Sequence, residues 1–318
     1  MVFNNCITCA DDLVTSLEMT RAGFIEAALE KNHKAQPLID AANSFRALAR
    51  RAKRPMDLLK IEQIRIPLLT ASGLSDKAFK YFREEDKVEA ITKMIRTFLE
   101  PAGNNFVDEL VYRYLLIKGD SLGGSMRNYV GAVAKHKLIR KILSVLHIED
   151  KQYQILYKED KVRNEWHIMN YMFDYENVDS VYAIHWVANG ISRLLFFDSK
   201  IPLVNKNVDI CLYEGTPEDF DGGRIVFDND SAIMFGELKG GIDPAGADEH
   251  WKTGNTALTR IRTAFADYDI QTSFIAAAIE KEMSEEIWSQ LCNDVLNNAA
   301  NITVNEQLTN YCKWVIEL

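Results

Sequence analysis

A change of hydrophobic periodicity near residue 150 constrains the fold of this chain more than any other feature of its sequence. Before that point, apolar residues recur at three- and four-residue spacing, which predicts helices such as 20–31, 41–53 and 87–98. Turn signals such as Arg54-Pro55 separate these segments, and alternating β-branched residues are scarce. Residues 1–150 are therefore expected to form an α-helical domain.

The remaining residues, 151–318, predict a different architecture. Short runs rich in β-branched and aromatic residues indicate strands at 153–157, 180–186, 193–197, 208–213, 232–238 and 272–279. Helical patterns occupy 247–265, 285–297 and 303–314. Strands that come first as a hairpin and then alternate with helices favour a mixed sheet flanked by helices, which is an α/β (α+β) fold.

Composition and terminal segments limit the class of protein. Of the 318 residues, 47% are hydrophobic and 26% are charged, as in ordinary soluble domains. No uncharged run approaches the length of a membrane span, and the first residues lack the pattern of a secretory signal. Cys6 and Cys9 form a CxxC without a second pair, so we expect no zinc site there. A cytoplasmic protein without membrane contact is expected.

Three residues in the second half carry the clearest chemical signal. Asp209 lies in one predicted strand, and Glu237 and Lys239 lie in the next strand along the chain. Residues two apart in a strand point the same way, so Glu237 and Lys239 share a face, on which a neighbouring strand would also place Asp209. Two carboxylates can hold Mg²⁺, and an ammonium can stabilise developing charge. Phosphodiester hydrolysis needs this combination.

The E-x-K spacing alone is weak support, because it occurs elsewhere in the chain. Other examples lie in runs of charge typical of solvated turns or helix ends: Glu85/Lys87, Glu149/Lys151 and Glu159/Lys161. Only Glu237/Lys239 follows an apolar strand and precedes two glycines, where charges are costly unless they are used. A strand end with a surface salt bridge remains the alternative.

Several long segments give a more specific indication. GELKGGIDPAGADEHWKTGNTALTRIR at 236–262 closely resembles the type II restriction endonucleases of the AvaI/BsoBI family. The same holds for FLEPAGNNFVDELVYRYLL at 98–116, GDSLGGSMRN at 119–128 and IPLVNKNVDICL at 201–212. The resemblance implies a PD-(D/E)xK nuclease fold, a Mg²⁺-dependent homodimer and a cognate methyltransferase in the cell. It also implies cleavage of double-stranded DNA within C-pyrimidine-C-G-purine-G, with four-base 5′ overhangs.

The same resemblance assigns roles to individual residues. It places Asp209, Glu237 and Lys239 in the catalytic signature and gives Asp209, Glu237 and Leu238 as the metal-binding residues. Val208 stands where the general pattern has proline, which the chemistry does not require. His250, at the start of the helix after the site, matches an active-site histidine of the family. It would orient or deprotonate the attacking water, and a packed or surface histidine is the alternative.

Basic and glycine residues suggest how DNA would be held. Residues 1–150 contain 23 basic and 19 acidic residues, whereas 151–318 contain 14 and 27, so the first half is the expected phosphate-binding half of a chain with net charge −9. Gly123 and Gly124 are expected to form a turn before a helix at 125–142, where backbone amides and Arg127 would contact the DNA backbone.

Base recognition needs donors and acceptors in the major groove. Asp243 is a candidate acceptor for cytosine, although an aspartate before Pro244 is also a good helix cap. Lys77 and Lys206 are candidate guanine contacts. All three match family positions that the resemblance implies to lie near bases.

Rival interpretations start from the same residues. Gly119-Asp120-Ser121-Leu122 spells the signature of a class of serine esterases, with Ser121 as nucleophile, but the motif follows a helical pattern instead of a strand. A repair or junction nuclease would share the metal site without a demanding sequence preference. A DNA-binding protein without activity would bind but not cut.

Overall fold

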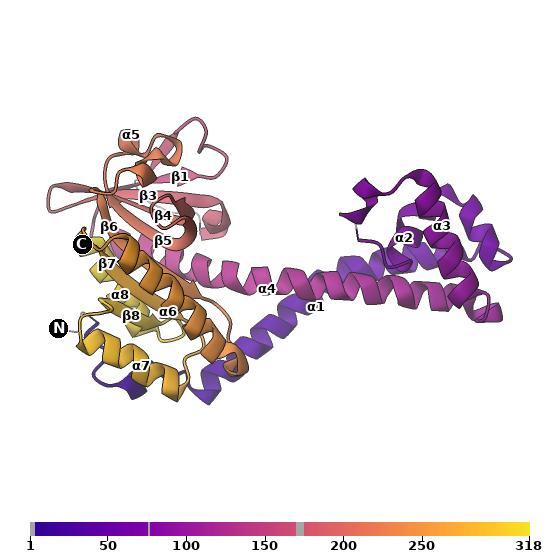
Figure 1. The fold of residues 1–318 in the computed structure, drawn as a ribbon, viewed down its shortest axis with the longest axis horizontal. Coiled ribbons are helices and arrows are strands. Elements are labelled where there is room, and N and C mark those ends of the chain that lie inside the picture. The colour runs from indigo at the N-terminus through magenta and orange to yellow at the C-terminus, as the bar shows by residue number, and fades with distance from the viewer. Residues whose placement is uncertain (1–3, 76, 170–174) are drawn as a thin grey trace. The chain divides into compact units, whose positions relative to one another are not determined.

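The computed structural model describes residues 4–75, 77–169 and 175–318, and Figure 1 shows their helices and strands. The chain divides into two compact units, of which one contains the chain up to Phe24 together with Tyr129–Leu318 and the other contains Ile25–Asn128. The helices α1 (Leu17–Ala49) and α4 (Phe106–Ile148) contribute to both units. Each unit has its own hydrophobic core.

The first unit is built on one mixed sheet. Its strand order is β2-β1-β3-β4-β5-β6-β7-β8; pairs are antiparallel as far as β6, and β6-β7-β8 are parallel. The strands are β1 (Tyr153–Tyr157), β2 (Trp166–Met169), β3 (Val181–Ala188), β4 (Ile191–Ile201), β5 (Lys206–Glu214), β6 (Ala232–Lys239), β7 (Gln271–Ala276) and β8 (Asn298–Asn301). Helices α5 (Pro217–Phe220), α6 (Ala247–Ala264), α7 (Lys281–Cys292) and α8 (Asn305–Glu317) complete the unit.

Alternating side chains of the strands supply two separate cores, because successive residues of a strand face opposite sides of the sheet. On one side, Phe196, Cys211 and Phe235 pack with Trp251 and Leu258 of α6. The core on the other side contains strand residues together with residues of α4 and α8, including Leu138, Leu195, Ile210, Leu212, Met234, Leu308 and Tyr311. The expected α+β architecture, a mixed sheet flanked by helices, is confirmed.

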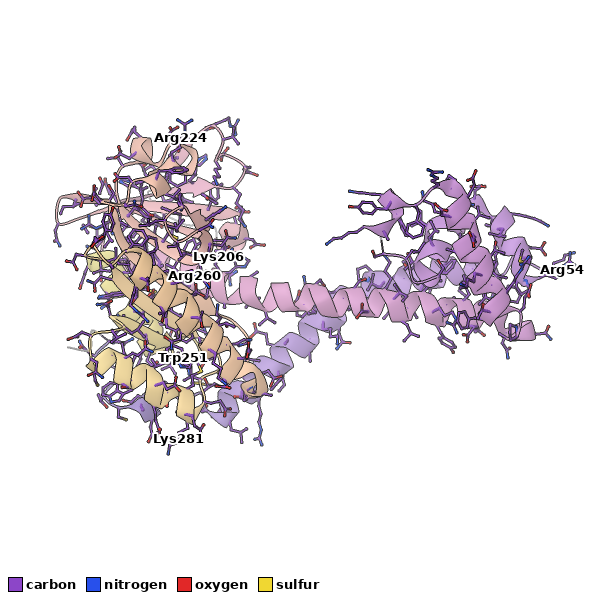
Figure 2. The ribbon with its side chains drawn as sticks, in the orientation of Figure 1. Arg54, Lys206, Arg224, Trp251, Arg260 and Lys281 are labelled. Atoms are coloured by element: carbon purple, nitrogen blue, oxygen red, sulfur yellow. The ribbon has the colours of Figure 1, made fainter. Side chains whose placement is uncertain are left out.

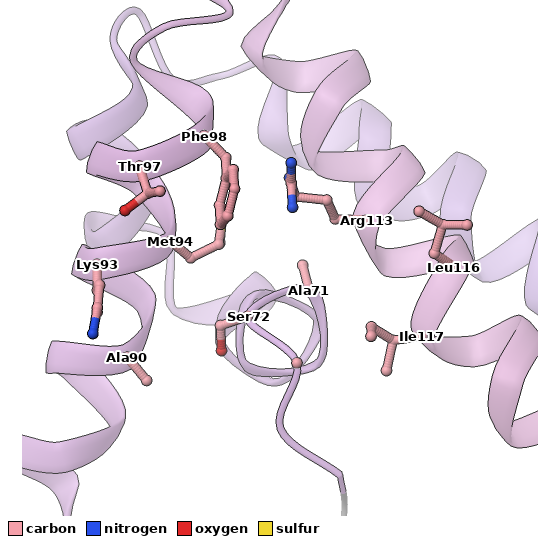
Figure 3. A pocket seen from close by; sticks show the side chains of 11 residues that line it. Ala71, Ser72, Ala90, Lys93, Met94, Thr97, Phe98, Arg113, Leu116 and Ile117 are labelled. Carbon is pink, nitrogen blue, oxygen red and sulfur yellow. The ribbon is translucent and has the colours of Figure 1, made fainter.

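The second unit is helical and packs around a third core. It contains parts of α1 and α4 with α2 (Arg65–Ala71), α3 (Glu84–Met94) and a π-helical turn at Ile95–Leu99. Phe45 and Tyr114 meet edge to face with ring centroids 5.3 Å apart in this core. Figure 3 shows a pocket between α2, α3 and α4, where the Arg113 guanidinium lies 3.6 Å from the centre of the Phe98 ring.

Short helical turns connect these elements. They are of the 3-10 type and lie at Ala10–Leu13, Pro55–Lys60, Glu62–Ile64, Ala78–Tyr81, Gly103–Asn105, Tyr175–Ser180, Asp221–Phe227 and Pro244–Gly246. No helix among the described residues is long and apolar enough to cross a membrane.

Several local expectations were wrong. The helices expected at 20–31 and 41–53 are a single helix, α1, which continues through Pro37. The turn expected at Gly123 and Gly124 is absent, because both glycines lie inside α4. A glycine costs roughly 1 kcal/mol in a helix interior, and the buried residues of α4 on either side of these two, such as Tyr114 and Leu138, offset that cost by packing.

The boundary expected at residue 150 marks the change from helix to strand, whereas the compact units are divided at residues 24/25 and 128/129. The reason is that the last part of α4 belongs to the sheet's own core. Leu138, Ile139 and Ile142 of α4 are fully buried there against strand residues. A change of secondary structure and a change of core therefore fall at different places in this chain.

Candidate active site

The predicted catalytic residues lie at the ends of β5 and β6. These strands are antiparallel, and Ile210 pairs with Gly236, which puts Asp209 and Glu237 immediately beside that pair on neighbouring strands. The backbone N–H of Leu238 donates a hydrogen bond of 2.9 Å to Oδ2 of Asp209. The strand end is thereby tied to the first carboxylate, which fixes the orientation of Asp209.

Lys239 joins both carboxylates. Its Nζ lies 2.7 Å from Oε2 of Glu237 and 3.7 Å from Oδ2 of Asp209. Glu237 and Lys239 follow Phe235 at two-residue steps, so they share the sheet face that α6 covers. The three groups expected to converge do converge.

Helix α6 confines the lysine from the other side. Gly254 is buried in this helix, and a Cβ placed on it would lie 2.7 Å from the Phe274 ring and 3.6 Å from Cε of Lys239. Only glycine allows so close an approach without displacing the ring. The stem of Lys239 is therefore held between the helix and the sheet.

Burial and charge disturb the ionisation of this group. Glu237 is 4% exposed. Burial, and then repulsion from Asp209, raise the pKa of its carboxyl to about 7 although Lys239 acts in the opposite direction. Burial acts to lower the pKa of Lys239, but the charges and hydrogen bonds of Glu237 and Asp209 outweigh it, so its pKa is raised. Lys239 is therefore an ammonium, and this single positive charge lies beside two carboxyl groups.

These residues fit a hard divalent cation. The available donors are two carboxyl groups beside one ammonium, and carboxylate oxygens are the ligands that Mg²⁺ prefers. Among the described residues, no three His, Cys, Asp or Glu side chains gather as a ready-made metal cluster. The remaining protein ligand would be the backbone carbonyl of Leu238, the third metal-binding residue that the resemblance implies.

The three residues line an open depression of the surface. Its other walls come from the end of β4, the turn to β5 and one side of α6, and they include Lys200, Asn205, Lys206, Asn207, Thr253, Ala257 and Arg260. Figure 2 shows Lys206 and Arg260 close to each other on this side of the first unit. Lys206, a candidate base contact, is therefore brought to the site.

The whole chain matches one family of known proteins. The family model described as "Restriction endonuclease BsobI" matches residues 3–318. The chain belongs to this family of restriction endonucleases. It is 49% identical to the type II restriction enzyme BsoBI of Geobacillus stearothermophilus, over 99% of this chain and 98% of that enzyme. It is 45% identical to the type II restriction enzyme AvaI of Nostoc sp., over the full length of both. The chain is accordingly a site-specific deoxyribonuclease.

His250 lies beside the turn that follows Lys239, outside the depression. A Cβ on Gly241 would come within 2.5 Å of Cε1 of His250, and one on Gly246 within 3.6 Å. Nδ1 of His250 is buried and forms no hydrogen bond within the described part of the chain. In this restriction endonuclease the imidazole ring therefore packs against Gly241 and Gly246, and its Nδ1 has no hydrogen-bond partner among the described residues. The catalytic role of His250 stays a prediction.

The other DNA-binding candidates are dispersed. Asp243 caps the 3-10 turn at Pro244–Gly246, where its Oδ1 accepts a hydrogen bond of 3.0 Å from the N–H of Ala245, so the capping alternative is realised. Lys77 is exposed in the second unit. Arg127 lies in α4, and its side chain falls outside the described part of the structure. Contacts of these residues with DNA remain predictions.

The correction at Gly123 and Gly124 also bears on function. Amides inside a helix are used by the helix itself, so the proposed reason for a phosphate contact at these glycines is removed. Ser121 is likewise inside α4, where its Oγ donates to the carbonyl of Ile117 at 3.1 Å. The strand-to-turn setting of an esterase nucleophile is absent from this described segment.

Sequence reasoning missed Lys200, Thr253 and Arg260. Each is an ordinary polar residue of a strand end or helix, and only the pairing of β4 with β5 and the packing of α6 bring them to the depression. A weak signal existed in α6, because Thr253, Ala257 and Arg260 recur at four- and three-residue steps on one side of the helix.

Proposed function

We propose that this restriction endonuclease cuts both strands of DNA at C-pyrimidine-C-G-purine-G in a Mg²⁺-dependent reaction and leaves four-base 5′ overhangs. The single observation that supports the chemistry best is the convergence of a buried Glu237, Asp209 and Lys239 at one end of β5 and β6. Family membership and the matching segments support the target sequence.

In this proposal each group of the site has a defined task. Asp209, Glu237 and the carbonyl of Leu238 hold Mg²⁺, which when bound polarises the scissile phosphate and acidifies water. Lys239, fixed by Glu237 at 2.7 Å, stabilises the negative charge that develops on the phosphate during attack. His250 orients the attacking water or accepts its proton. The helical unit Ile25–Asn128, the larger part of the expected domain 1–150, embraces the duplex, and the unit built on the sheet cuts it.

Two alternatives predict different results with the same substrates. A duplex carrying the site is incubated with and without Mg²⁺ beside a duplex with one base pair changed. We expect cutting of the first duplex only, and only with Mg²⁺. Equal cutting of both would indicate a repair or junction nuclease, and binding without cutting would indicate an inactive DNA-binding protein. Because unprotected host sites would be cut, a cognate methyltransferase is the proposed cellular partner.

A palindromic site calls for a two-fold symmetric enzyme, because each strand presents the same sequence to one protomer. The protein is therefore expected to sediment as a homodimer, either free or on its duplex. Analytical ultracentrifugation with and without the duplex measures this. One protomer per duplex at all concentrations would contradict the proposal.

His250→Ala is expected to slow single-turnover cleavage by about 10²–10⁴-fold, the range typical of a positioned acid or base. Duplex affinity and the midpoint of thermal unfolding should change little. His147→Ala, at an exposed histidine in the last turn of α4, is the matched control. A wild-type rate for His250→Ala would show that the ring only packs against Gly241.

A further inference from the structure

Two cations beside the candidate active site take no part in the proposed chemistry. Lys200 stands at the end of β4 and Arg260 stands on α6, and both line the depression that contains Asp209, Glu237 and Lys239. The turn between β4 and β5 is tight, with Asn205 in the left-handed region at φ 53° and its N–H bonded to the carbonyl of Ile201 at 2.8 Å. The strand ends therefore stand at a defined place in the wall.

Strand pairing puts Lys200 on the same face as the catalytic group. Lys200 pairs with Asn207 across β4 and β5, and Asn207 is two residues from Asp209 on β5. Directly paired residues and residues two apart both point to the same side of a sheet. Since β5 separates β4 from β6, Lys200 is two strands away from Lys239, or roughly 10 Å at the usual strand spacing.

Arg260 reaches the depression from the helix side. Thr253, Ala257 and Arg260 line it at steps of four and three residues, which is one stripe along α6. Helix α6 packs on β6 and β7, whereas Lys200 comes from β4. The two cations are therefore contributed from different walls of the same depression.

The lining of the depression has more positive than negative side chains, whereas the whole chain is acidic. Its lining includes four cationic side chains, Lys200, Lys206, Lys239 and Arg260, against the two carboxylates of Asp209 and Glu237, in a chain of net charge −9. Lys200 and Arg260 have no hydrogen-bond or ion-pair partner among the described residues. Some exposed cations elsewhere are paired, as Arg224 is with Asp221 at 3.3 Å, whereas others, such as Lys281, have no such partner among the described residues.

We propose that Lys200 and Arg260 bind phosphates that flank the scissile phosphate on the cut strand, an inference that rests on the proposed function. Asp209 and Glu237 are engaged with Lys239, so the excess of positive charge in the lining attracts an anionic ligand, and a DNA backbone offers phosphates in a row. Lys200 lies two strands away from Lys239, so we assign it to a phosphate next to the scissile one. Arg260 holds its phosphate with two parallel hydrogen bonds. Both residues position the strand over the metal ligands.

Salt dependence of binding tests this independently of cleavage. Affinity for the site duplex is measured in EDTA by fluorescence anisotropy at several salt concentrations, because the slope of log K against log salt falls by about 0.9 for each lost phosphate contact. Lys200→Ala and Arg260→Ala are each expected to reduce the slope by about that amount, equally on site and non-site duplexes. Arg260→Lys should retain most of it.

The matched controls are exposed cations of the same unit that lie away from the depression, Arg224→Ala for arginine and Lys281→Ala for lysine (Figure 2). A neutral methylphosphonate is then moved along one strand. At one position near the cut, the methylphosphonate should lower the affinity of wild type but should not lower the affinity of Arg260→Ala further. At another position, it should likewise lower the affinity of wild type but not that of Lys200→Ala.

Slopes equal to those of the two controls would overturn the inference, and so would losses confined to the site duplex, which would indicate base contacts. Failure of the proposed function would be seen separately. In that case wild type would not cut the site with Mg²⁺, whereas the slopes in EDTA would still report whether Lys200 and Arg260 touch phosphate.

Discussion

Glu237→Gln and Asp209→Ala are expected to lower single-turnover cleavage by about 10³-fold or more, while binding of the site duplex persists. Each change removes a ligand of the proposed Mg²⁺ site, and a bound metal contributes several kcal/mol of transition-state stabilisation. The rate is measured on a site duplex at saturating Mg²⁺, and binding is measured in EDTA. Normal cleavage by either variant at ordinary Mg²⁺ would remove these residues from the site.

Folding of Glu237→Gln can be checked without activity. Burial and Asp209 raise the pKa of Glu237 to about 7. Near neutral pH and above, ionisation of this carboxyl therefore destabilises the metal-free fold, and glutamine has no such charge. The variant should therefore unfold in EDTA at no lower temperature than wild type. Mg²⁺ should raise the unfolding temperature of wild type but not of the variant, because a ligand stabilises only the fold that binds it.

Two matched controls come from the other E-x-K sequences. Glu85 and Glu159 are exposed, and Glu85→Gln and Glu159→Gln remove the same charge from surfaces without a converging aspartate. Such surface changes usually alter stability by no more than about 0.5 kcal/mol. We expect both variants to cut at the wild-type rate, so a loss confined to Glu237→Gln reports on position and not on total charge.

Lys239→Ala is expected to lower the cleavage rate by about 10²-fold or more with little loss of affinity. The ammonium is held by Glu237 at 2.7 Å and Asp209 at 3.7 Å, and its pKa is raised, so it stays charged where the phosphate would react. Loss of one group that stabilises only the transition state lowers the rate of the chemical step more than ground-state binding.

The control for the lysine is Lys151→Ala, the lysine of another E-x-K sequence, which lies 3.9 Å from Glu149. Single-turnover rates and duplex affinities are measured for both variants. A Lys239→Ala protein that mainly loses affinity and keeps its rate at saturating protein would make Lys239 a DNA-positioning contact.

The convergence of these three side chains could be predicted because they lie on neighbouring strands. Two-residue spacing alone put Glu237 and Lys239 on one face, and an adjacent strand carrying Asp209 completed the group. Periodicity could not predict β8, whose residues Asn298–Asn301 lack β-branched side chains and form a strand through buried pairing with β7. It also could not show that α4 passes through Gly123 and Gly124, since glycines that end a helix elsewhere are tolerated within this one.

Residues that depend on tertiary packing were the hardest to predict. Lys200 and Arg260 belong to the depression only because β4 pairs with β5 and α6 lies on β6 and β7. Lys206 was selected through the family resemblance, and the pairing of Ile201 with Lys206 explains its position at the same wall. A residue's place on a strand can be predicted from its neighbours in sequence, whereas its place beside a helix cannot.

Sequencing the ends of digested DNA tests the central claim most directly. A plasmid of known sequence that contains several C-pyrimidine-C-G-purine-G sites is incubated with the protein, with and without Mg²⁺, and both strands of every product end are sequenced. With Mg²⁺ we expect every end to lie within such a site and to carry a four-base 5′ overhang, and without Mg²⁺ we expect intact plasmid. Ends at unrelated sequences, nicks in one strand only, or cutting in EDTA would contradict the assignment.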